Sequence, residues 1–260
     1  MNLDLTGKHA FVCGSSQGIG KAAAMELAKL GATVTLIARN DARLRSAVAD
    51  LPGKVKHDYI IADFSNPEQL RESIGKYLSK EKIIHILVNN TGGPAGGTIA
   101  EAHLEEFTSA FSNHLLCNHI LAQAVLPGMK LNGYGRIINI ISTSVKQPLR
   151  GLGVSNTIRA AVANWAKTLS MEVAPFGITV NNVLPGATAT QRLESILESK
   201  AVKTGITKEL LTKEMLHEIP AGRFASTEEV AAAIAFLATP AAAYINGINL
   251  PVDGGRTGNL

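Results

Sequence analysis

The chain has 260 residues, of which 46% are apolar and 18% are charged, and its formal net charge is +4. This length suits one large α/β domain or two small ones, and the apolar share supports a packed core, which excludes global disorder. The basic residues do not gather into a tract, which argues against nucleic-acid binding. No apolar stretch is long enough to span a bilayer, and the N-terminal stretch lacks a basic region followed by a long apolar run. We therefore expect a cytoplasmic protein with no membrane association.

The two cysteines, Cys13 and Cys117, both fall in apolar segments. This placement favours buried free thiols in a reducing compartment over a disulfide. We expect no metal site.

Short β-branched segments alternate along the chain with longer segments of helical period. The β-branched segments lie at residues 9–14, 33–39, 55–64, 83–90, 136–142, 178–186 and 246–255. The helical segments lie at residues 18–31, 40–51, 66–80, 101–130, 154–174 and 227–239. This alternation is typical of a parallel sheet covered on both faces. We predict one α/β domain over residues 1–260, a Rossmann-type doubly wound parallel sheet of about seven strands.

Residues 187–225 interrupt this alternation, because they show a helical pattern and no strand. The segment is too long for an ordinary connection in a compact domain. An insertion beyond the carboxyl end of a strand predicts a substrate lid, with a structural cap as the alternative.

A glycine-rich turn, CGSSQGIGKAAA, connects the first predicted strand to the first predicted helix. Glycines there allow a tight turn and bring backbone N–H groups close to a phosphate at the positive end of a helix. We expect Gly14, Ser16, Gly18, Ile19 and Gly20 to contact a dinucleotide. The alternative is a plain strand-to-helix turn.

The second predicted strand ends in Ala38-Arg39-Asn40, with no carboxylate at its tip. A carboxylate there would hydrogen-bond the 2′-hydroxyl of NAD, whereas a guanidinium suits a 2′-phosphate. Arg39 therefore predicts that NADP(H) is preferred over NAD(H), with a solvated surface arginine as the alternative. Asp41 is expected in the first turn of the next helix, where it complements the helix dipole.

The motifs GSSQGIG (14–20), NNTGG (89–93), PG (185–186) and VDGG (252–255) together resemble the short-chain dehydrogenase/reductase family over nearly the full chain. The resemblance is greatest to its 3-oxoacyl-(acyl carrier protein) reductase-like members. It implies that the cofactor site also includes Asp63 at the adenine, Asn89 and Asn90 at the sheet end, Gly92, Pro185 and Gly186 at its border, and Thr188 and Thr190 near the nicotinamide. It also implies a homotetramer or homodimer that pairs the helices of 101–130 and 154–174.

The same resemblance places the catalytic residues, and here the chain departs from the family pattern of Asn, Ser, Tyr and Lys. Ser142 in NIISTS matches the serine, and counting on by the usual gap reaches Ser155 and Arg159, where the tyrosine and lysine belong. His114 stands at the asparagine position. The resemblance thus implies a divergent member with an altered catalytic tetrad.

These replacements change the proton supply more than the charge stabilisation. A serine hydroxyl is far less acidic than a phenol, and an arginine cannot release its proton. Ser155 and Arg159 are i,i+4 neighbours on one helical face, so with Ser142 they can still hydrogen-bond a developing alkoxide. His114 is the expected replacement donor, because an imidazole titrates near neutrality, with a space-filling helix histidine as the alternative.

Three functional hypotheses follow. The first is an NADP-dependent oxidoreductase that acts on a small carbonyl or alcohol substrate through a rearranged proton path. The second is a nucleotide-binding protein without dehydrogenase activity, and the third is an enzyme that uses the cofactor site for an elimination or isomerisation.

Two other residues are weaker candidates for the proton donor. Lys146 lies just after Ser142 but is more simply a solvated lysine, and Tyr134 lies at the wrong end of the sheet to donate a proton.

Overall fold

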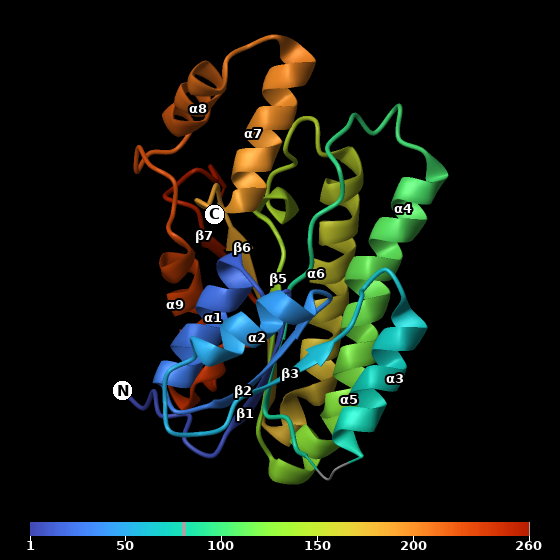
Figure 1. Cartoon of the computed structure of the whole chain (residues 1–260), viewed down its shortest axis with the longest axis vertical. Helices are drawn as coiled ribbons and strands as arrows, with labels where there is room; N and C mark the ends of the chain where they lie inside the picture. The colour runs from blue at the N-terminus through green and yellow to red at the C-terminus, as the bar shows by residue number, and fades with distance from the viewer. Residues whose placement is uncertain (80–81, 260) are drawn as a thin grey trace.

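Seven parallel strands form one sheet in the computed structural model of the chain, which describes residues 1–79 and 82–259 (Figure 1). The spatial order of the strands is β3-β2-β1-β4-β5-β6-β7. The strands are β1 (His9–Cys13), β2 (Thr33–Ala38), β3 (Asp58–Ile61), β4 (Ile86–Asn89), β5 (Gly135–Ile140), β6 (Ile178–Pro185) and β7 (Asn249–Val252). This order confirms the predicted single-domain, Rossmann-type doubly wound α/β fold.

Helices cover both faces of the sheet, as its apolar strands require. One face packs against α1 (Gly18–Lys29), α2 (Asp41–Ala49) and α9 (Thr227–Ala238). The other packs against α3 (Pro67–Leu78), α5 (Cys117–Asn132) and α6 (Gly153–Val173). In β1, Val12 faces the first helix layer while Phe11 and Cys13 face the second, and all three side chains are fully buried. Strands that are buried on both faces have continuous apolar sequences, which is why the sequence pattern predicted their positions.

The expectation of one long helix over 101–130 is wrong in two respects. Helix α4 (Leu104–Phe111) begins later, because the extended backbone of His103 forms its N-cap and the Glu106 carboxylate accepts a hydrogen bond from the His103 backbone N–H. A π-helical turn, η1 (Ser112–Leu116), then separates α4 from α5. Such turns insert one extra residue into a helix and occur frequently at functional sites. The apolar period continues across the insertion, so the sequence pattern did not reveal it.

The segment 187–225 forms α7 (Gln191–Thr204) and α8 (Lys208–His217), which project beyond the carboxyl ends of the strands (Figure 1). Thr190 caps α7 by accepting a hydrogen bond from the Leu193 N–H at 3.3 Å. The remaining short helices are η2 (Thr143–Val145), η3 (Ala174–Phe176) and η4 (Pro240–Ala242). In the part of the chain that the structure describes, no helix has the length and apolar character needed to cross a membrane.

Candidate active site

The glycine-rich turn lies where the strand order changes direction, between β1 and its neighbour β4. At such a switch point the connections diverge and leave a crevice beyond the carboxyl ends of the strands. The Asn90 Nδ2 donates to the Gly14 carbonyl at 3.2 Å and so joins the loops that follow the two strands. A Cβ added at Gly20 would lie 2.3 Å from that same carbonyl oxygen. Only a glycine lets α1 start this close to the turn.

The N-terminus of α1 is left open toward the crevice. Its cap residue, Gln17, makes no side-chain hydrogen bond to the first helical turn. Gly18, the first residue of the helix, has a φ of 58°, in the left-handed region that favours glycine. Backbone N–H groups at an uncapped helix N-terminus suit a phosphate. Ser16 is half-buried in the turn, and Ile19 packs against the first helix layer.

A further serine in this turn, Ser15, was missed by the sequence reasoning. It is buried, donates its hydroxyl to the Val12 carbonyl at 2.7 Å and accepts a hydrogen bond from the Ile37 N–H at 3.1 Å. These bonds hold the turn against β1 and β2. The only signal in the sequence is a second hydroxyl residue in GSSQGIG, which does not tell which serine points inward.

Two exposed arginines lie at the outer end of the crevice. Arg39 follows β2, as predicted, and Arg43 donates from Nη1 to the Gln17 Oε1 at 2.7 Å. Asp41 is the first residue of α2 and pairs with Arg45 at 3.0 Å, which confirms its predicted place in the first turn. Arg43 was missed because only the folded turn brings Gln17 beside it.

Asp63 belongs to the same end of the sheet. Its carboxylate accepts a hydrogen bond from the Ser65 N–H at 3.0 Å. That backbone hydrogen bond lowers the pKa of Asp63, and the charge of Arg39 lowers it further. Asp63 is therefore an ionised hydrogen-bond acceptor near Arg39.

Four asparagines form a hydrogen-bonded row across the carboxyl half of the sheet. Asn89 donates to Asn139 at 2.9 Å, Asn139 donates to Asn182 at 2.9 Å, and Asn182 donates to Asn249 at 2.8 Å. They occupy adjacent register positions on β4, β5, β6 and β7. The Asn89 Oδ1 is buried without a hydrogen-bond partner at the start of the row. The row links the four strands through side chains in one register, which the sequence did not indicate beyond Asn89.

The catalytic candidates come from β5 and α6. Ser142 caps η2, where its Oγ accepts a hydrogen bond from the Ser144 N–H at 3.1 Å, and η2 packs against α6. Ser155 is half-buried in the first turn of α6. One turn further on, Arg159 is 8% exposed and donates from Nη1 to the Ile140 carbonyl at 3.1 Å. The structure thus brings Arg159 to the carboxyl end of β5, with Ser155 one helical turn earlier on α6.

His114 lies in the π-turn and is 2% exposed. Its Nδ1 shares a hydrogen bond with the Thr91 hydroxyl from the loop after β4. Burial lowers the pKa of His114 to about 3, and the charge of Arg159 contributes. His114 is therefore neutral at pH 7, in contrast to the near-neutral titration expected from a free imidazole. Thr91 is another residue that the sequence reasoning did not single out.

The end of β6 and the start of the 187–225 segment border the same crevice. The Gly186 N–H donates to the Val252 carbonyl at 2.9 Å, which ties Pro185-Gly186 to β7. Thr188 is buried and donates to the Gly186 carbonyl at 3.1 Å. A Cβ added at Gly18 would lie 3.7 Å from the Thr190 Cγ2, so the start of α7 lies against the glycine-rich turn. In contrast, a Cβ added at Gly92 would meet nothing within 4 Å.

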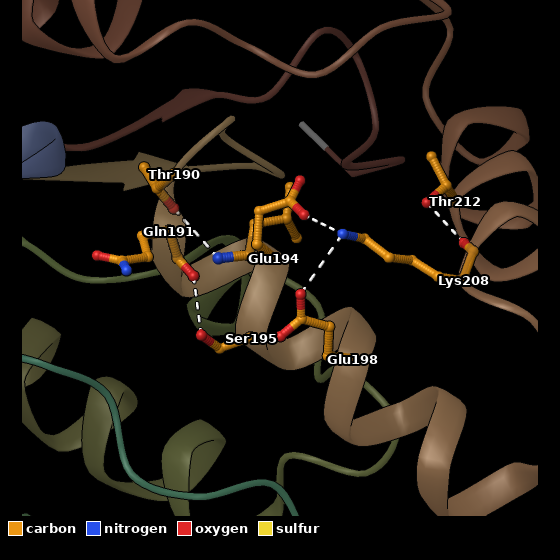
Figure 2. A network of polar contacts seen from close by, with 8 residues as sticks. Thr190, Gln191, Glu194, Ser195, Glu198, Lys208 and Thr212 are labelled. Carbon is orange, nitrogen blue, oxygen red and sulfur yellow. Dashed lines mark hydrogen bonds and ion pairs between the residues drawn. The ribbon is translucent and has the colours of Figure 1, made fainter.

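The two helices of this segment are joined by a lysine. Figure 2 shows Lys208 of α8 between the carboxylates of Glu194 and Glu198 of α7, with the second pair at 3.6 Å. The Thr212 hydroxyl donates to the Lys208 carbonyl at 2.8 Å. Ion pairs this exposed to solvent are weak, so they orient the two helices without locking them.

Several groups lie outside the site. The Tyr134 hydroxyl donates to the Ala238 carbonyl at 2.7 Å, at the amino end of β5, which confirms that it is misplaced for catalysis. Cys13 and Cys117 are buried free thiols, as expected. Burial raises the pKa of both thiols, that of Cys117 to about 12, so neither is a nucleophile at neutral pH. Among the described residues, no group of three or more His, Cys, Asp or Glu could hold a metal ion.

Residues 14–257 match the family model described as enoyl-(acyl carrier protein) reductase. The chain is 33% identical to the NADPH-dependent reductase BacG of Bacillus subtilis, over 95% of this chain and 96% of that protein. It is 34% identical to the 3-oxoacyl-[acyl-carrier-protein] reductase FabG of Vibrio cholerae, over 97% and 98% of the two chains. The solved structure of L-sorbose reductase from Gluconobacter frateurii, complexed with NADPH and L-sorbose, superposes with a TM-score of 0.93 at 33% identity over the whole of both chains. The chain belongs to the short-chain dehydrogenase/reductase family, whose relatives named here are reductases.

Proposed function

We propose that the protein is an NADP(H)-dependent, 3-oxoacyl reductase-like oxidoreductase that interconverts a small carbonyl compound and its alcohol. The observation that carries the proposal is the contact of buried Arg159 with the carboxyl end of β5, one helical turn from Ser155 on the same face of α6. NADPH-dependent relatives support the cofactor. The altered tetrad makes the proton path, rather than hydride transfer, the step that distinguishes this chain.

The residues at the crevice fit a dinucleotide. The uncapped N-terminus of α1 would hold the diphosphate, and Gly20 keeps the turn close enough for its N–H groups to reach it. Arg39 and Arg43 would pair with a 2′-phosphate, and Asp63 would accept from the adenine. Asn90, Gly92, Pro185, Gly186 and Thr188 would border the nicotinamide half. When bound, the nicotinamide supplies or accepts the hydride.

Charge stabilisation would come from three side chains. The hydroxyls of Ser142 and Ser155 can donate to the carbonyl oxygen, and the Arg159 guanidinium places a fixed positive charge beside them. Burial lowers the pKa of Arg159 to about 10, and the charge of Arg192 contributes. Arg159 thus stays protonated at neutral pH and acts through charge rather than by giving up a proton.

His114 is the proposed proton relay. Because it is neutral, one imidazole nitrogen can give a proton while the other accepts one. The Thr91 hydroxyl at Nδ1 can supply that second proton and recover its own from water. A relay of this kind is slower than a phenol held beside a lysine, so the proposal implies low turnover of generic ketones.

The test is a binding titration of NADPH and NADH, paired with a turnover screen over carbonyl substrates. We expect tighter binding of NADPH and measurable oxidation of NADPH with at least one substrate class. His114→Ala should then lower that rate further, by about 10²-fold or more if the relay is the acid. Tight NADPH binding without turnover of any carbonyl would instead favour a nucleotide-binding protein without dehydrogenase activity.

A further inference from the structure

Two arginine side chains from distant parts of the chain converge beside Gly93. A Cβ added at Gly93 would lie 3.7 Å from the Arg159 Nη2 and 3.8 Å from the Arg192 Nη2. Arg159 belongs to α6, the helix of the catalytic candidates, and Arg192 is the second residue of α7. Two positive charges therefore face one another across the loop that follows β4.

The buried member of the pair has no acidic partner in the described parts of the chain. The Arg159 side chain is 8% exposed, and its hydrogen bond to the Ile140 carbonyl uses Nη1 alone. A guanidinium has five N–H donors, so most of its hydrogen-bonding capacity is open on the side of Gly93. Burying a charge without a counterion is costly unless a ligand supplies one. The positive charge of Arg192, which lies beside the same glycine, increases that cost.

The second arginine is held in place by the loop itself. The Arg192 Nη2 donates to the Gly93 carbonyl at 3.1 Å and to the Pro94 carbonyl at 2.9 Å. No described carboxylate pairs with Arg192 either, and its side chain is exposed. A guanidinium oriented by two backbone carbonyls is preorganised, and its remaining N–H groups are free to meet a ligand.

We infer that the substrate carries a carboxylate, and that this carboxylate binds between Arg159 and Arg192 while the reacting carbonyl lies toward Ser142 and Ser155. Arginine pairs recognise carboxylates through charge-assisted, often bidentate hydrogen bonds. Ser155 and Arg159 are one helical turn apart, which places their Cβ atoms about 5–6 Å from each other. That spacing fits a short 2-oxo or 3-oxo acid, and the positive charge of the two arginines favours the acid over its neutral ester. The inference rests on the proposed reductase function.

The first experiment compares acids with their neutral counterparts. NADPH oxidation is measured with benzoylformate and methyl benzoylformate, and with acetoacetate and methyl acetoacetate. For at least one pair we expect kcat/KM of the acid to exceed that of the ester by about tenfold or more, as expected for charge-assisted hydrogen bonds. Arg192→Gln should bring this ratio close to one. Lys203→Gln, which removes a positive charge from the exposed last turn of the same helix, should leave the ratio unchanged.

The acid-to-ester ratio of kcat/KM distinguishes anion binding by Arg192 from a purely structural role of this residue. If Arg192 only attached α7 to the loop, its loss would lower acid and ester alike and preserve their ratio, which would overturn the inference. If Arg192→Gln weakened NADP⁺ binding but kept the ratio, the anion would be the cofactor diphosphate, and the inference would be wrong. No preference for either acid in the wild type would also refute it.

Calorimetry separates this inference from the proposed function. Mandelate and 3-hydroxybutyrate, the products expected from the two acids, are titrated into the NADP⁺-loaded protein and its Arg192→Gln variant. Binding that Arg192→Gln abolishes, without turnover of any carbonyl, would support the anion site and reject the reductase. Turnover of the esters, with no acid preference and no binding of either hydroxy acid, would support the reductase and reject the anion site.

Discussion

The crevice at the β1–β4 switch point and the group of side chains around Arg159 of α6 are formed in different ways. The crevice is formed mainly by backbone: the glycine-rich turn, the open end of α1 and the Gly14 carbonyl bound by Asn90. The group around Arg159 consists of side chains from separate elements, with His114 of η1 near Arg159 of α6 and Arg192 of α7. A site formed by backbone depends on the local chain conformation, so its chemistry changes little when nearby side chains are substituted. In a side-chain-built site, one or two substitutions can alter the chemistry while the fold stays intact.

The largest effect is expected from breaking the backbone-built crevice with Gly20→Ala. The new Cβ would lie 2.3 Å from the Gly14 carbonyl oxygen and 2.8 Å from the Asn90 Nδ2, so the turn must move away from α1. Losing two phosphate hydrogen bonds predicts about 100-fold weaker NADPH binding. Calorimetric titration measures it, and Gly75→Ala, where a Cβ meets nothing within 4 Å, is the matched control. Unchanged affinity in Gly20→Ala would show that the turn does not hold the phosphates.

Substitutions around Arg159 should change the reaction chemistry without disturbing the fold or cofactor binding. We predict that Ser155→Tyr combined with Arg159→Lys raises the rate of carbonyl reduction by about 10²-fold or more, because it restores an efficient general acid. Ser155→Tyr alone should help less, since an arginine lowers a phenol pKa by its charge but cannot reproduce the point contacts of a lysine. The measurement is NADPH oxidation across 3-oxoacyl, ester and simple ketone substrates.

The control for this prediction is the NADPH affinity of each variant. A double variant that binds NADPH normally and stays as slow as the wild type on every substrate would contradict it. The surroundings of residues 155 and 159 would then differ from those of an active reductase at more than these two positions, and a non-catalytic role would gain support.

Cofactor choice is a property of the crevice that we assign to a side chain, Arg39, rather than to the backbone. We predict that Arg39→Asp reverses the preference for NADPH over NADH, with a change in the affinity ratio of about 10- to 100-fold, because a carboxylate accepts from a ribose hydroxyl and repels a phosphate. Arg39→Gln should reduce the preference without reversing it. Equal affinities of the wild type for both cofactors, measured by calorimetry, would disprove the role of Arg39.

The smallest effect concerns the stability of the protein at low pH. Burial lowers the pKa of His114 to about 3, below that of an unfolded histidine, so the unfolded state binds a proton first as the pH falls below about 6.5. The free energy of unfolding should therefore decrease as the pH falls from 7 to 5. In His114→Asn this decrease should be smaller by about 1–2 kcal/mol, as measured by urea denaturation at both pH values.

His9 provides an internal reference for that measurement. It lies at the other end of the sheet, and burial lowers its pKa to about 4, so it contributes a similar decrease in both proteins. If the wild type and His114→Asn lost the same stability on acidification, His114 would not be buried in its neutral form.

Several features of the site were open to sequence reasoning because they depend on neighbours along the chain. The glycine spacing of the turn, the arginine after β2 and the i,i+4 relation of Ser155 and Arg159 are all local. The alternation of apolar strands and helices is also local, and it was enough to predict the architecture. Interruptions such as the π-turn at 112–116 were not visible, because the apolar pattern continues through them.

Other features depend on which side chains fold together. The row from Asn89 to Asn249 needs four strands in one register. The contact of Arg192 with Gly93 joins residues 99 positions apart. Neither has a periodic pattern that a single sequence reveals.

The sequence by itself determined that this chain forms a doubly wound sheet with a glycine-rich turn, because the periods of strands and helices and the residues of a turn depend on neighbours along the chain. It also determined which chemical groups are present at the end of β5 and on α6. The tertiary structure alone decided their electrostatic state, since desolvation and charge proximity arise only on folding. A histidine that would titrate near neutrality in water is neutral here, and two arginines that are far apart in the sequence meet at one glycine.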